Sequence, residues 1–352
     1  MQTLFIPTHR ALLISDTLTQ IHKGLRSVIW ECVHRATGQR YAVKIVDRRN
    51  LNKNKEKAVY REIHMLDIID PNTPGTIHLH QYFDEFTHLY IITEYIPGGN
   101  LLARIIRKKN ISEAETKVVI RSMLECLVSH HRNGTVHRNL KPDNILLDGL
   151  SAIIADYGLA AQLMYDDTGQ MVLFTSRCGT SAYVAPEILN KQPYASQVDM
   201  WGVGIIAYMC LAGYPPFADN SKQVLFEMIS KGAYTFDPKD WAKVSRSAKR
   251  FISSLLHVDP SVRMTAEEAL HHPWLAVKIP APPVVEEVIA PPPPPPPLDT
   301  ISPKTSPTNK LRRALSNLLG GKKDYGIEKA GDDGSMTSYN TSNMSTDNPG
   351  QR

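Results

Sequence analysis

Cysteine is scarce in this sequence. Four cysteines occur among 352 residues, at positions 32, 126, 178 and 210, and no two of them stand at C-x-x-C spacing. This spacing indicates neither a zinc site nor a disulfide framework. We therefore expect reduced thiols and a cytoplasmic location.

Long apolar runs are also missing. The longest, residues 202–214, is too short to cross a bilayer and instead predicts a buried core helix. The N-terminal residues lack a basic region followed by a long apolar stretch, so we expect no secretory signal. No transmembrane segment is expected.

A large excess of charge of one sign is absent as well. The formal net charge is +5, which at this length does not point to a nucleic-acid partner. Hydrophobic residues make up 42% of the chain and charged residues 21%. These are the proportions of an ordinary globular protein with one or two domains.

The first part of the chain has the pattern of a small sheet. Residues 12–46 alternate apolar and polar positions and predict three antiparallel strands, with a turn at 36–38 between the second and third. Residues 52–69 change to helical spacing with one apolar face. Two more strands are predicted at 77–83 and 88–95.

Helical patterns dominate after a Pro-Gly-Gly turn at 97–99. Ser112 is a candidate cap for a long helix. Further helices are predicted near 184–190, 197–213, 221–231, 245–256 and 265–270. A strand-rich lobe followed by a helix-rich lobe is an α+β architecture, and we expect a cleft where the lobes meet.

The composition changes near residue 276. Residues 276–307 form a proline-rich linker with seven consecutive prolines at 291–297, a run that favours extended polyproline II. Residues 308–323 form a basic amphipathic segment. Residues 324–352 are rich in Ser, Thr, Asn, Gly and Asp, and we expect them to be disordered.

Residues 137–147 read His-Arg-Asn-Leu-Lys-Pro-Asp-Asn-Ile-Leu-Leu, and Asp-Tyr-Gly follows at 156–158. This pair of motifs resembles the catalytic loop and metal-binding turn of a protein kinase. The resemblance covers 12–275 and implies the bilobal kinase fold, with lobes at 12–96 and 97–275 after an N-terminal extension at 1–11.

The nearest likeness is to the calcium/calmodulin-dependent, phosphorylase-kinase-like group of serine/threonine kinases. It is carried by Cys-Gly-Thr-Ser-Ala-Tyr-Val-Ala-Pro-Glu at 178–187 and Tyr-Pro-Pro-Phe at 214–217. In that group the equivalent of Thr180 bonds the catalytic Asp and Lys. The resemblance thus implies ATP as the phosphoryl donor and protein serine or threonine as the acceptor.

The resemblance also implies a nucleotide site. Lys44 in Tyr-Ala-Val-Lys would hold the ATP phosphates and pair with Glu62 on the next helix. The glycine-rich loop keeps Gly24 but has His22 in place of its first glycine, which indicates weakened nucleotide binding. The cofactor-binding residues implied are Ile21, Gly24, Ser27, Ile29, Ala42, Lys44, Thr93, Glu94, Ile96 and Leu146.

The catalytic residues implied are Lys44, Glu62, Lys141 and Asp156, together with position 139. Lys141 would neutralise the transferred phosphoryl group, and Asn144 and Asp156 would hold Mg²⁺. The family has Asp at position 139, and this chain has Asn139.

An amide oxygen can accept a hydrogen bond, but it is not a base. Two functions therefore stay open, an impaired kinase or pseudokinase with an allosteric or scaffold role, and a working kinase that acts on a protein substrate.

The activation segment carries further implied roles. Ser176 matches an activating phosphosite of some relatives, with Arg138 to receive the phosphate, although it also fits an ordinary loop serine. Glu187 and Arg263 would form the ion pair of the large lobe, and an Asp at 199 would brace the catalytic loop.

The C-terminal residues contain two segments that resemble binding segments, and each has more than one interpretation. Residues 308–320 resemble a calmodulin target or a membrane-surface helix, and Leu311-x-Arg313-x-x-Ser316 resembles a substrate that could act as an intramolecular pseudosubstrate. A solvated helix without such a role is equally compatible. The prolines at 291–297 fit an SH3, EVH1 or profilin-type partner, or a simple spacer.

Overall fold

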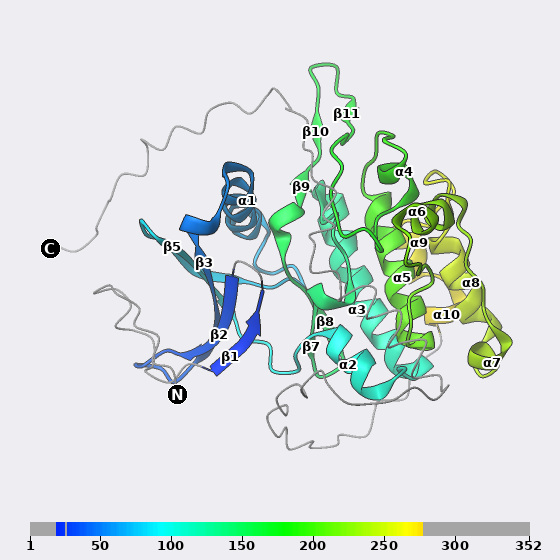
Figure 1. The fold of residues 1–352 in the computed structure, drawn as a ribbon, viewed down its shortest axis with the longest axis horizontal. Helices are drawn as coiled ribbons and strands as arrows, with labels where there is room; N and C mark the ends of the chain where they lie inside the picture. Colours follow the sequence, from blue (N-terminus) through cyan, green and yellow to red (C-terminus); the bar gives the residue numbers. More distant parts are fainter. Residues whose placement is uncertain (1–18, 25–26, 277–352) are drawn as a thin grey trace, which may run out of the picture.

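The computed structural model describes residues 19–24 and 27–276 (Figure 1). Within these ranges a strand-rich small lobe is followed by a helix-rich large lobe, as the sequence predicts. The predictions for the N-terminal extension and for residues 277–352, including the proline-rich, basic amphipathic and C-terminal segments, lie outside the described residues.

The small lobe is built on an antiparallel sheet of five strands in the order β1-β2-β3-β5-β4. The strands are β1 (Thr19–Lys23), β2 (Ser27–Val33), β3 (Arg40–Asp47), β4 (Leu79–Asp84) and β5 (His88–Glu94). The predicted turn between β2 and β3 is closed by a hydrogen bond from Gly38 N to His34 O of 2.8 Å. All five strands predicted from the alternating pattern are confirmed, with their ends moved by a few residues.

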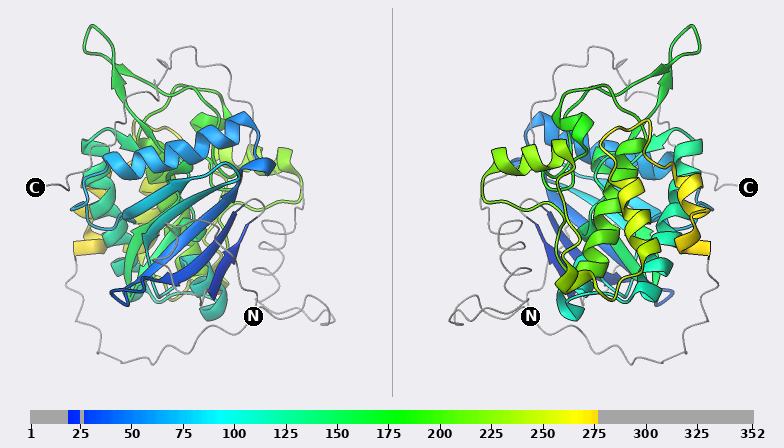
Figure 2. Two further views of the ribbon diagram at one scale, coloured as in Figure 1. Left: turned by 90° about the vertical axis from the view of Figure 1, so that its left-hand side faces the viewer. Right: turned by 90° about the vertical axis from the view of Figure 1, so that its right-hand side faces the viewer.

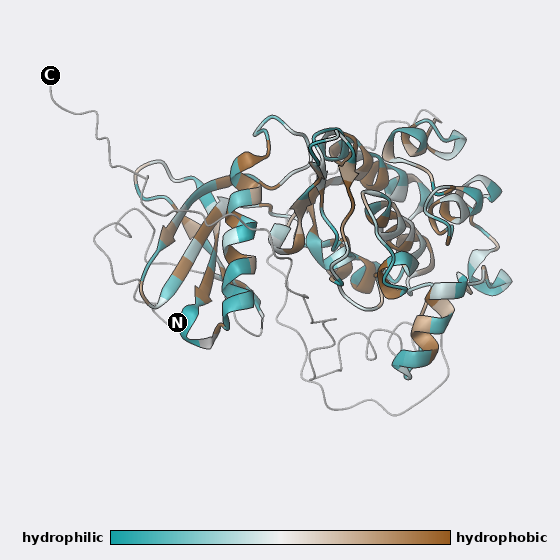
Figure 3. Cartoon of the chain, turned by 90° about the horizontal axis from the view of Figure 1, so that it is seen from above, coloured by the Kyte–Doolittle hydropathy of each residue, from teal (hydrophilic) through white to brown (hydrophobic). Residues whose placement is uncertain are grey.

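The predicted helix of the small lobe is α1 (Lys53–Ile68). It begins where the Asn52 side chain accepts a hydrogen bond from Lys55 N, and it buries Ile63, Met65 and Leu66. It runs beside the sheet in the left view of Figure 2, and most of its residues are hydrophilic in Figure 3. The buried face places Glu62, only 7% exposed, toward the interior.

The large lobe is organised around α5 (Gln197–Ala212), which is buried along almost its whole length. This confirms the core helix predicted from the apolar run. The helices around it (Figure 2, right) are α2 (Leu101–Lys108), α3 (Glu113–Arg132), α4 (Pro186–Leu189), α6 (Lys222–Lys231), α7 (Pro238–Trp241), α8 (Arg246–Leu255), α9 (Ala266–Leu270) and α10 (Pro273–Ala276). Ser112 caps α3 as predicted, since its hydroxyl accepts from Glu115 N.

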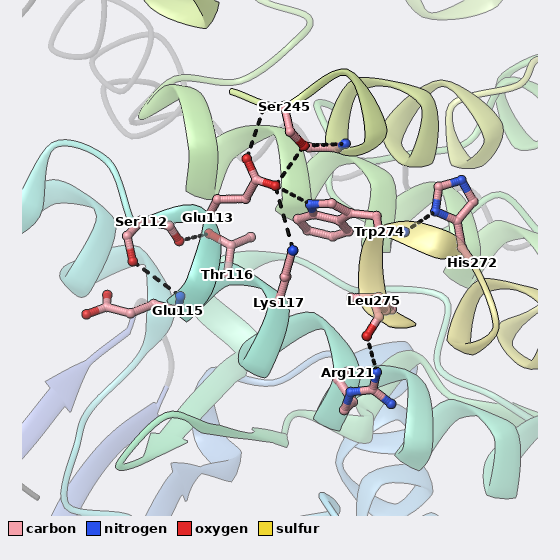
Figure 4. A network of polar contacts seen from close by, with 11 residues as sticks. Ser112, Glu113, Glu115, Thr116, Lys117, Arg121, Ser245, His272, Trp274 and Leu275 are labelled. Carbon is pink, nitrogen blue, oxygen red and sulfur yellow. Dashed lines mark hydrogen bonds and ion pairs between the residues drawn. The ribbon is translucent and has the colours of Figure 1, made fainter. Parts of the chain in front are cut away.

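Glu113 connects three helices of the large lobe (Figure 4). Its carboxylate accepts hydrogen bonds from Ser245 N and Oγ at 3.0 and 2.7 Å, and from Trp274 Nε1 at 2.8 Å. Arg121 donates to the carbonyl of Leu275 on the same side. The start of α3 is thereby tied to the start of α8 and to α10, where the described chain ends.

The remaining elements of the described residues are short strands and 3₁₀ turns. The strands are β6 (Thr135–Val136), β7 (Ile145–Asp148), β8 (Ser151–Ile154), β9 (Ala161–Gln162), β10 (Met164–Tyr165) and β11 (Met171–Val172), and the 3₁₀ turns are η2 (Arg48–Asn50), η3 (Pro142–Asn144) and η4 (Tyr157–Leu159). The β10–β11 hairpin extends beyond the two lobes in Figure 1. No helix in the described part of the chain is long and apolar enough to cross a membrane.

Candidate active site

Lys44 on β3 and Glu62 on α1 form the ion pair that the sequence predicts. Lys44 Nζ lies 2.8 Å from Glu62 Oε1 and 2.6 Å from Oε2. Burial alone would lower the pKa of Lys44, but the carboxylates of Glu62 and Asp156 outweigh it and raise that pKa above its ordinary value. The ammonium is therefore charged and held between sheet and helix.

Four of the predicted nucleotide-site residues of the sheet share one face. Ala42 is paired with Thr93 across β3 and β5, and Lys44 is paired with Ile29 across β2 and β3. Because alternate residues of a strand point to the same side, these four side chains line the same surface. Ile21 lies at a β-bulge in β1 and is 45% exposed, so it stands at the outer border of this surface.

The glycine-rich loop is partly described. Gly24 N donates to Ser27 O at 2.9 Å, which closes the loop between β1 and β2. A Cβ added to Gly24 would lie 3.3 Å from that carbonyl oxygen. His22, at the position of the family's first glycine, is an exposed residue of β1.

The segment between the lobes is held from two sides. Glu94 Oε1 accepts from His78 N and Nδ1 at 2.9 and 2.7 Å, which turns its side chain toward β4. Gly98 N donates to Leu147 O at 3.1 Å, and a Cβ on Gly98 would meet that oxygen at 2.2 Å. Only glycine allows this approach. It brings the segment after Ile96 against β7, which carries Leu146.

Hydrogen bonds attach the predicted catalytic loop to α5. Asp199 Oδ2 and Oδ1 accept from the backbone N–H groups of His137 and Arg138 at 2.9 and 2.8 Å. Burial would raise the pKa of Asp199, but hydrogen bonds from His131 and from the backbone keep it below its ordinary value. At this attachment to Asp199, the Arg138 backbone takes the left-handed conformation, with φ 63°.

Asn139 is fixed in the loop by its backbone and by its side chain. Its N–H donates to His137 Nδ1 at 3.3 Å, and its carbonyl accepts from Asn144 Nδ2 at 3.0 Å. Its Oδ1 accepts from the Thr180 hydroxyl at 3.2 Å, and Thr180 Oγ1 accepts from Lys141 Nζ at 3.4 Å. The structure thus brings Asn139, Lys141 and Thr180 together, as the family pattern implies.

Two oxygen donors could hold a divalent cation. Because Asn144 Nδ2 is used by the Asn139 carbonyl, its Oδ1 remains available as a ligand. Asp156, at φ 66°, supplies a carboxylate that interacts electrostatically with Lys44. An amide oxygen, a carboxylate and phosphate oxygens are the ligands that Mg²⁺ prefers, so these residues fit the predicted metal.

Tyr157, in the predicted metal-binding turn, packs against two histidines in the core. Its ring packs edge-on against His137 at 5.0 Å and against His130 at 5.6 Å between centroids. The Thr76 hydroxyl lies 2.9 Å from His130 Nε2 and 3.3 Å from Cys126 Sγ. This buried polar cluster was not predicted from the sequence. The only signal for it was Cys126 and His130 one helical turn apart on a predicted helix.

The activation segment is bound to the catalytic loop at Ser176. Arg138 Nη1 donates to Ser176 Oγ at 3.1 Å, and its guanidinium stacks over the Phe174 ring at 4.8 Å. Phe174 and Tyr194 exchange two backbone hydrogen bonds of 2.9 Å. The predicted Arg138–Ser176 contact is present, while the Phe174–Tyr194 bridge was not foreseen.

The comparisons with known proteins agree with this geometry. Residues 16–275 match the family described as "Protein kinase domain". The chain is 38% identical over 264 residues to a probable myosin light chain kinase of Dictyostelium discoideum, covering 73% of this chain and 81% of that protein. It is 42% identical over 243 residues to a calcium/calmodulin-dependent protein kinase type 1 of Caenorhabditis briggsae, covering 68% of this chain and 66% of that protein. A calcium/calmodulin-dependent protein kinase type I of Schizosaccharomyces pombe is 38% identical over 262 residues, covering 73% and 77%.

Proposed function

This chain belongs to the protein kinase family, and on that premise we propose that it binds Mg-ATP but transfers the γ-phosphoryl group to protein serine or threonine only slowly. Its main role is then that of a pseudokinase in signalling. One observation carries the proposal: Asn139 occupies the base position inside a frame of Lys44, Glu62, Lys141 and Asp156 that is otherwise assembled.

The size of the expected defect follows from the missing base. A positioned general base contributes about 10²–10⁴ in rate, which corresponds to about 3–5 kcal/mol of activation free energy. The Asn139 side chain offers no basic atom, and its amide oxygen already accepts from Thr180. Phosphoryl transfer relies mainly on positioning and electrostatic stabilisation, so a slow residual reaction is expected.

The alternative is a working serine/threonine kinase. It is favoured by the Lys44–Glu62 pair, by the attachment of the loop to Asp199, and by relatives whose names are those of kinases. Under this alternative, Lys141 and the Mg²⁺ held by Asn144 and Asp156 stabilise the transferred group well enough without a base. Both functions require the nucleotide, so nucleotide binding cannot separate them.

Radiolabelled phosphoryl transfer to a peptide separates the two. We expect the natural full-length chain to label the peptide near the background of Asp156→Asn, a change that keeps the residue compatible with φ 66°. We expect Asn139→Asp to raise the rate by about 10²–10⁴. Labelling by the natural chain well above the Asp156→Asn background, with little gain from Asn139→Asp, would favour the working kinase.

Regulation is proposed from the sequence and from one contact of the activation segment. Ser176, beside the Arg138 guanidinium, is the proposed phosphosite, since phosphate adds charge-assisted hydrogen bonds there. Control by calmodulin or by an intramolecular pseudosubstrate would act through residues 308–320, which lie outside the described residues. An SH3, EVH1 or profilin-type partner at 291–297 stays a prediction from sequence.

A further inference from the structure

We propose that the acceptor position of this site prefers an oxyanion to the hydroxyl of serine. The oxyanion is a carboxylate or phosphate presented by an extended peptide, so the site captures acidic or already phosphorylated side chains. This inference deepens the proposed function and rests on it, because it concerns the same catalytic loop. It comes from the direction in which the Asn139 amide faces.

The hydrogen bonds around Thr180 fix that direction. An ammonium group has donors only, so at 3.4 Å the Thr180 oxygen accepts from Lys141 Nζ. The single hydroxyl proton of Thr180 is then free to bond Asn139 Oδ1 at 3.2 Å. With the amide reversed, Thr180 would face two donors and its own proton would have no acceptor on Asn139. In the observed arrangement the Lys141 ammonium, the Thr180 hydroxyl and the Asn139 amide oxygen each have a partner.

The side-chain nitrogen of Asn139 is therefore the atom of the amide that remains without a partner in the described part of the chain. Among the described residues Asn139 Nδ2 has no hydrogen-bond partner, and it is not one of the side-chain atoms that are both buried and unpaired. The cavity beside Asn139, Thr180 and Leu140 measures only about 10 Å³, which is no more than one water occupies. The side chain cannot withdraw into it, and the proposal therefore directs Nδ2 toward the acceptor position.

A hydrogen-bond donor at the acceptor position has opposite consequences for a serine hydroxyl and for an oxyanion. With a serine hydroxyl, the N–H group would bind the oxygen lone pair that must attack, and nothing would take the proton. With an oxyanion, Asn139 Nδ2 and Lys141 Nζ both face an acceptor-only group, and hydrogen bonds to charged groups are the stronger kind. The carboxylate that kinases carry at this position would repel such a group.

The γ-phosphate of ATP would compete with the peptide for the positive charge of Lys141. The test therefore uses the whole 352-residue chain with Mg-ADP. The probes are four fluorescent peptide pools of random sequence around a fixed central Ser, Asp, phosphoserine or Ala. A matched set with the sequence of residues 308–320 places the same four residues at Ser316. Any occupancy of the site by the chain's own tail lowers all four affinities equally, so their ratios are preserved.

We expect the Asp and phosphoserine peptides to bind about tenfold more tightly than the Ser and Ala peptides, and tenfold corresponds to about 1.4 kcal/mol. Equal binding of Ser and Asp, or no measurable binding of any peptide, would overturn the proposal.

Two variants test the cause of the preference. Asn139→Asp replaces the donor by a carboxylate, and we expect the order to reverse so that Ser binds more tightly than Asp. Thr180→Ser keeps the hydroxyl and should keep the preference. Thr180→Val is similar in shape, releases the amide and should bring the ratio toward one. A preference for Asp that survives in Asn139→Asp would mean that Asn139 does not cause it.

Failure of the proposed function would look different. Nucleotide binding and the rate gain in Asn139→Asp are measured on the same preparations. If nucleotide binds and Asn139→Asp labels peptide while Ser and Asp pools bind alike, only the oxyanion preference is wrong. If no nucleotide binds, the proposed function is wrong, and the peptide ratios measured without nucleotide still decide the preference.

Discussion

At the scale of single residues, burial changes the pKa of His130, and this change has a testable consequence. It lies on α3 beside the Tyr157 ring, and its Nε2 meets the Thr76 hydroxyl at 2.9 Å. Burial, reinforced by the nearby His137, lowers the pKa of His130 to about 4. The structure therefore accommodates the neutral imidazole and resists the imidazolium.

A pH-dependent loss of stability follows. In the unfolded chain a histidine titrates near pH 6.5, so between pH 6.5 and about 4 the unfolded state binds more protons than the folded state. The free energy of unfolding therefore falls as the pH drops through this window. From pH 7 to 5 we expect His130 to account for a loss of about 2 kcal/mol, measured by urea unfolding.

His130→Leu should reduce this pH slope, because the apolar residue has no proton to gain. His64, exposed on α1, offers a matched control, and His64→Gln should leave the slope unchanged. Equal slopes in the natural chain and in His130→Leu would show that the other buried histidines, His137 among them, carry the effect.

The amide of Asn139 shows what the sequence could and could not predict at this scale. The family pattern placed Asn139, Lys141 and Thr180 together, and the contacts of 3.2 and 3.4 Å agree. Which end of the amide faces the acceptor position depends on the donors around Thr180. That arrangement is a property of three side chains in space, and no spacing in the sequence encodes it.

At the scale of elements, the activation segment is anchored by a buried ion pair. Glu187 on α4 meets Arg263, from the loop before α9, with oxygen–nitrogen distances of 2.7 and 3.0 Å. Both side chains are almost fully buried, and Arg263 also donates to Gln197 O at 2.8 Å and lies over the Trp201 ring. The pair predicted from the family pattern is confirmed.

Breaking this pair on one side should destabilise the large lobe strongly. Glu187→Gln leaves a buried guanidinium without its carboxylate, a change that typically costs about 3–5 kcal/mol. Urea unfolding measures the loss. The matched control is Glu227→Gln, which removes an exposed i,i+4 pair with Lys231 on α6 and should have little effect, since such pairs are solvated. Similar losses in both variants would contradict the buried-charge explanation.

Most of the elements that the sequence missed are short, although the eight-residue helix α2 was missed as well. The helices α4, α7 and α10 have four residues each, and of these three only α4 was predicted. A single turn offers too few positions for a 3.6-residue pattern to show. The β10–β11 hairpin pairs only two residues per strand, and exposed Met164 and Tyr165 give no buried face to detect. Long elements with one buried face, such as α1 and β3, were found because their pattern repeats.

At the scale of the whole molecule, the proposed nucleotide site draws on both lobes. Lys44 and Glu62 come from the sheet and α1, and Asn144 and Asp156 come from the loops of the large lobe. A ligand that binds only the folded chain stabilises it by an amount that grows with the logarithm of its free concentration over its dissociation constant. We expect His22, at the position of the family's first glycine, to weaken nucleotide binding and so to raise the nucleotide concentration that is needed.

Thermal unfolding with Mg-ATP tests this arrangement. At a nucleotide concentration of 100 times the dissociation constant we expect about 2.7 kcal/mol of stabilisation, or a rise in Tm of roughly 5–10 °C for a domain of this size. Asp156→Asn should lose most of the rise because it removes the carboxylate that would hold Mg²⁺. Asn139→Asp should keep the whole rise, since our proposal places position 139 at the acceptor and not at the nucleotide. No rise in the natural chain at millimolar Mg-ATP would contradict the assignment of the site, and loss of the rise in Asn139→Asp would contradict the place given to Asn139.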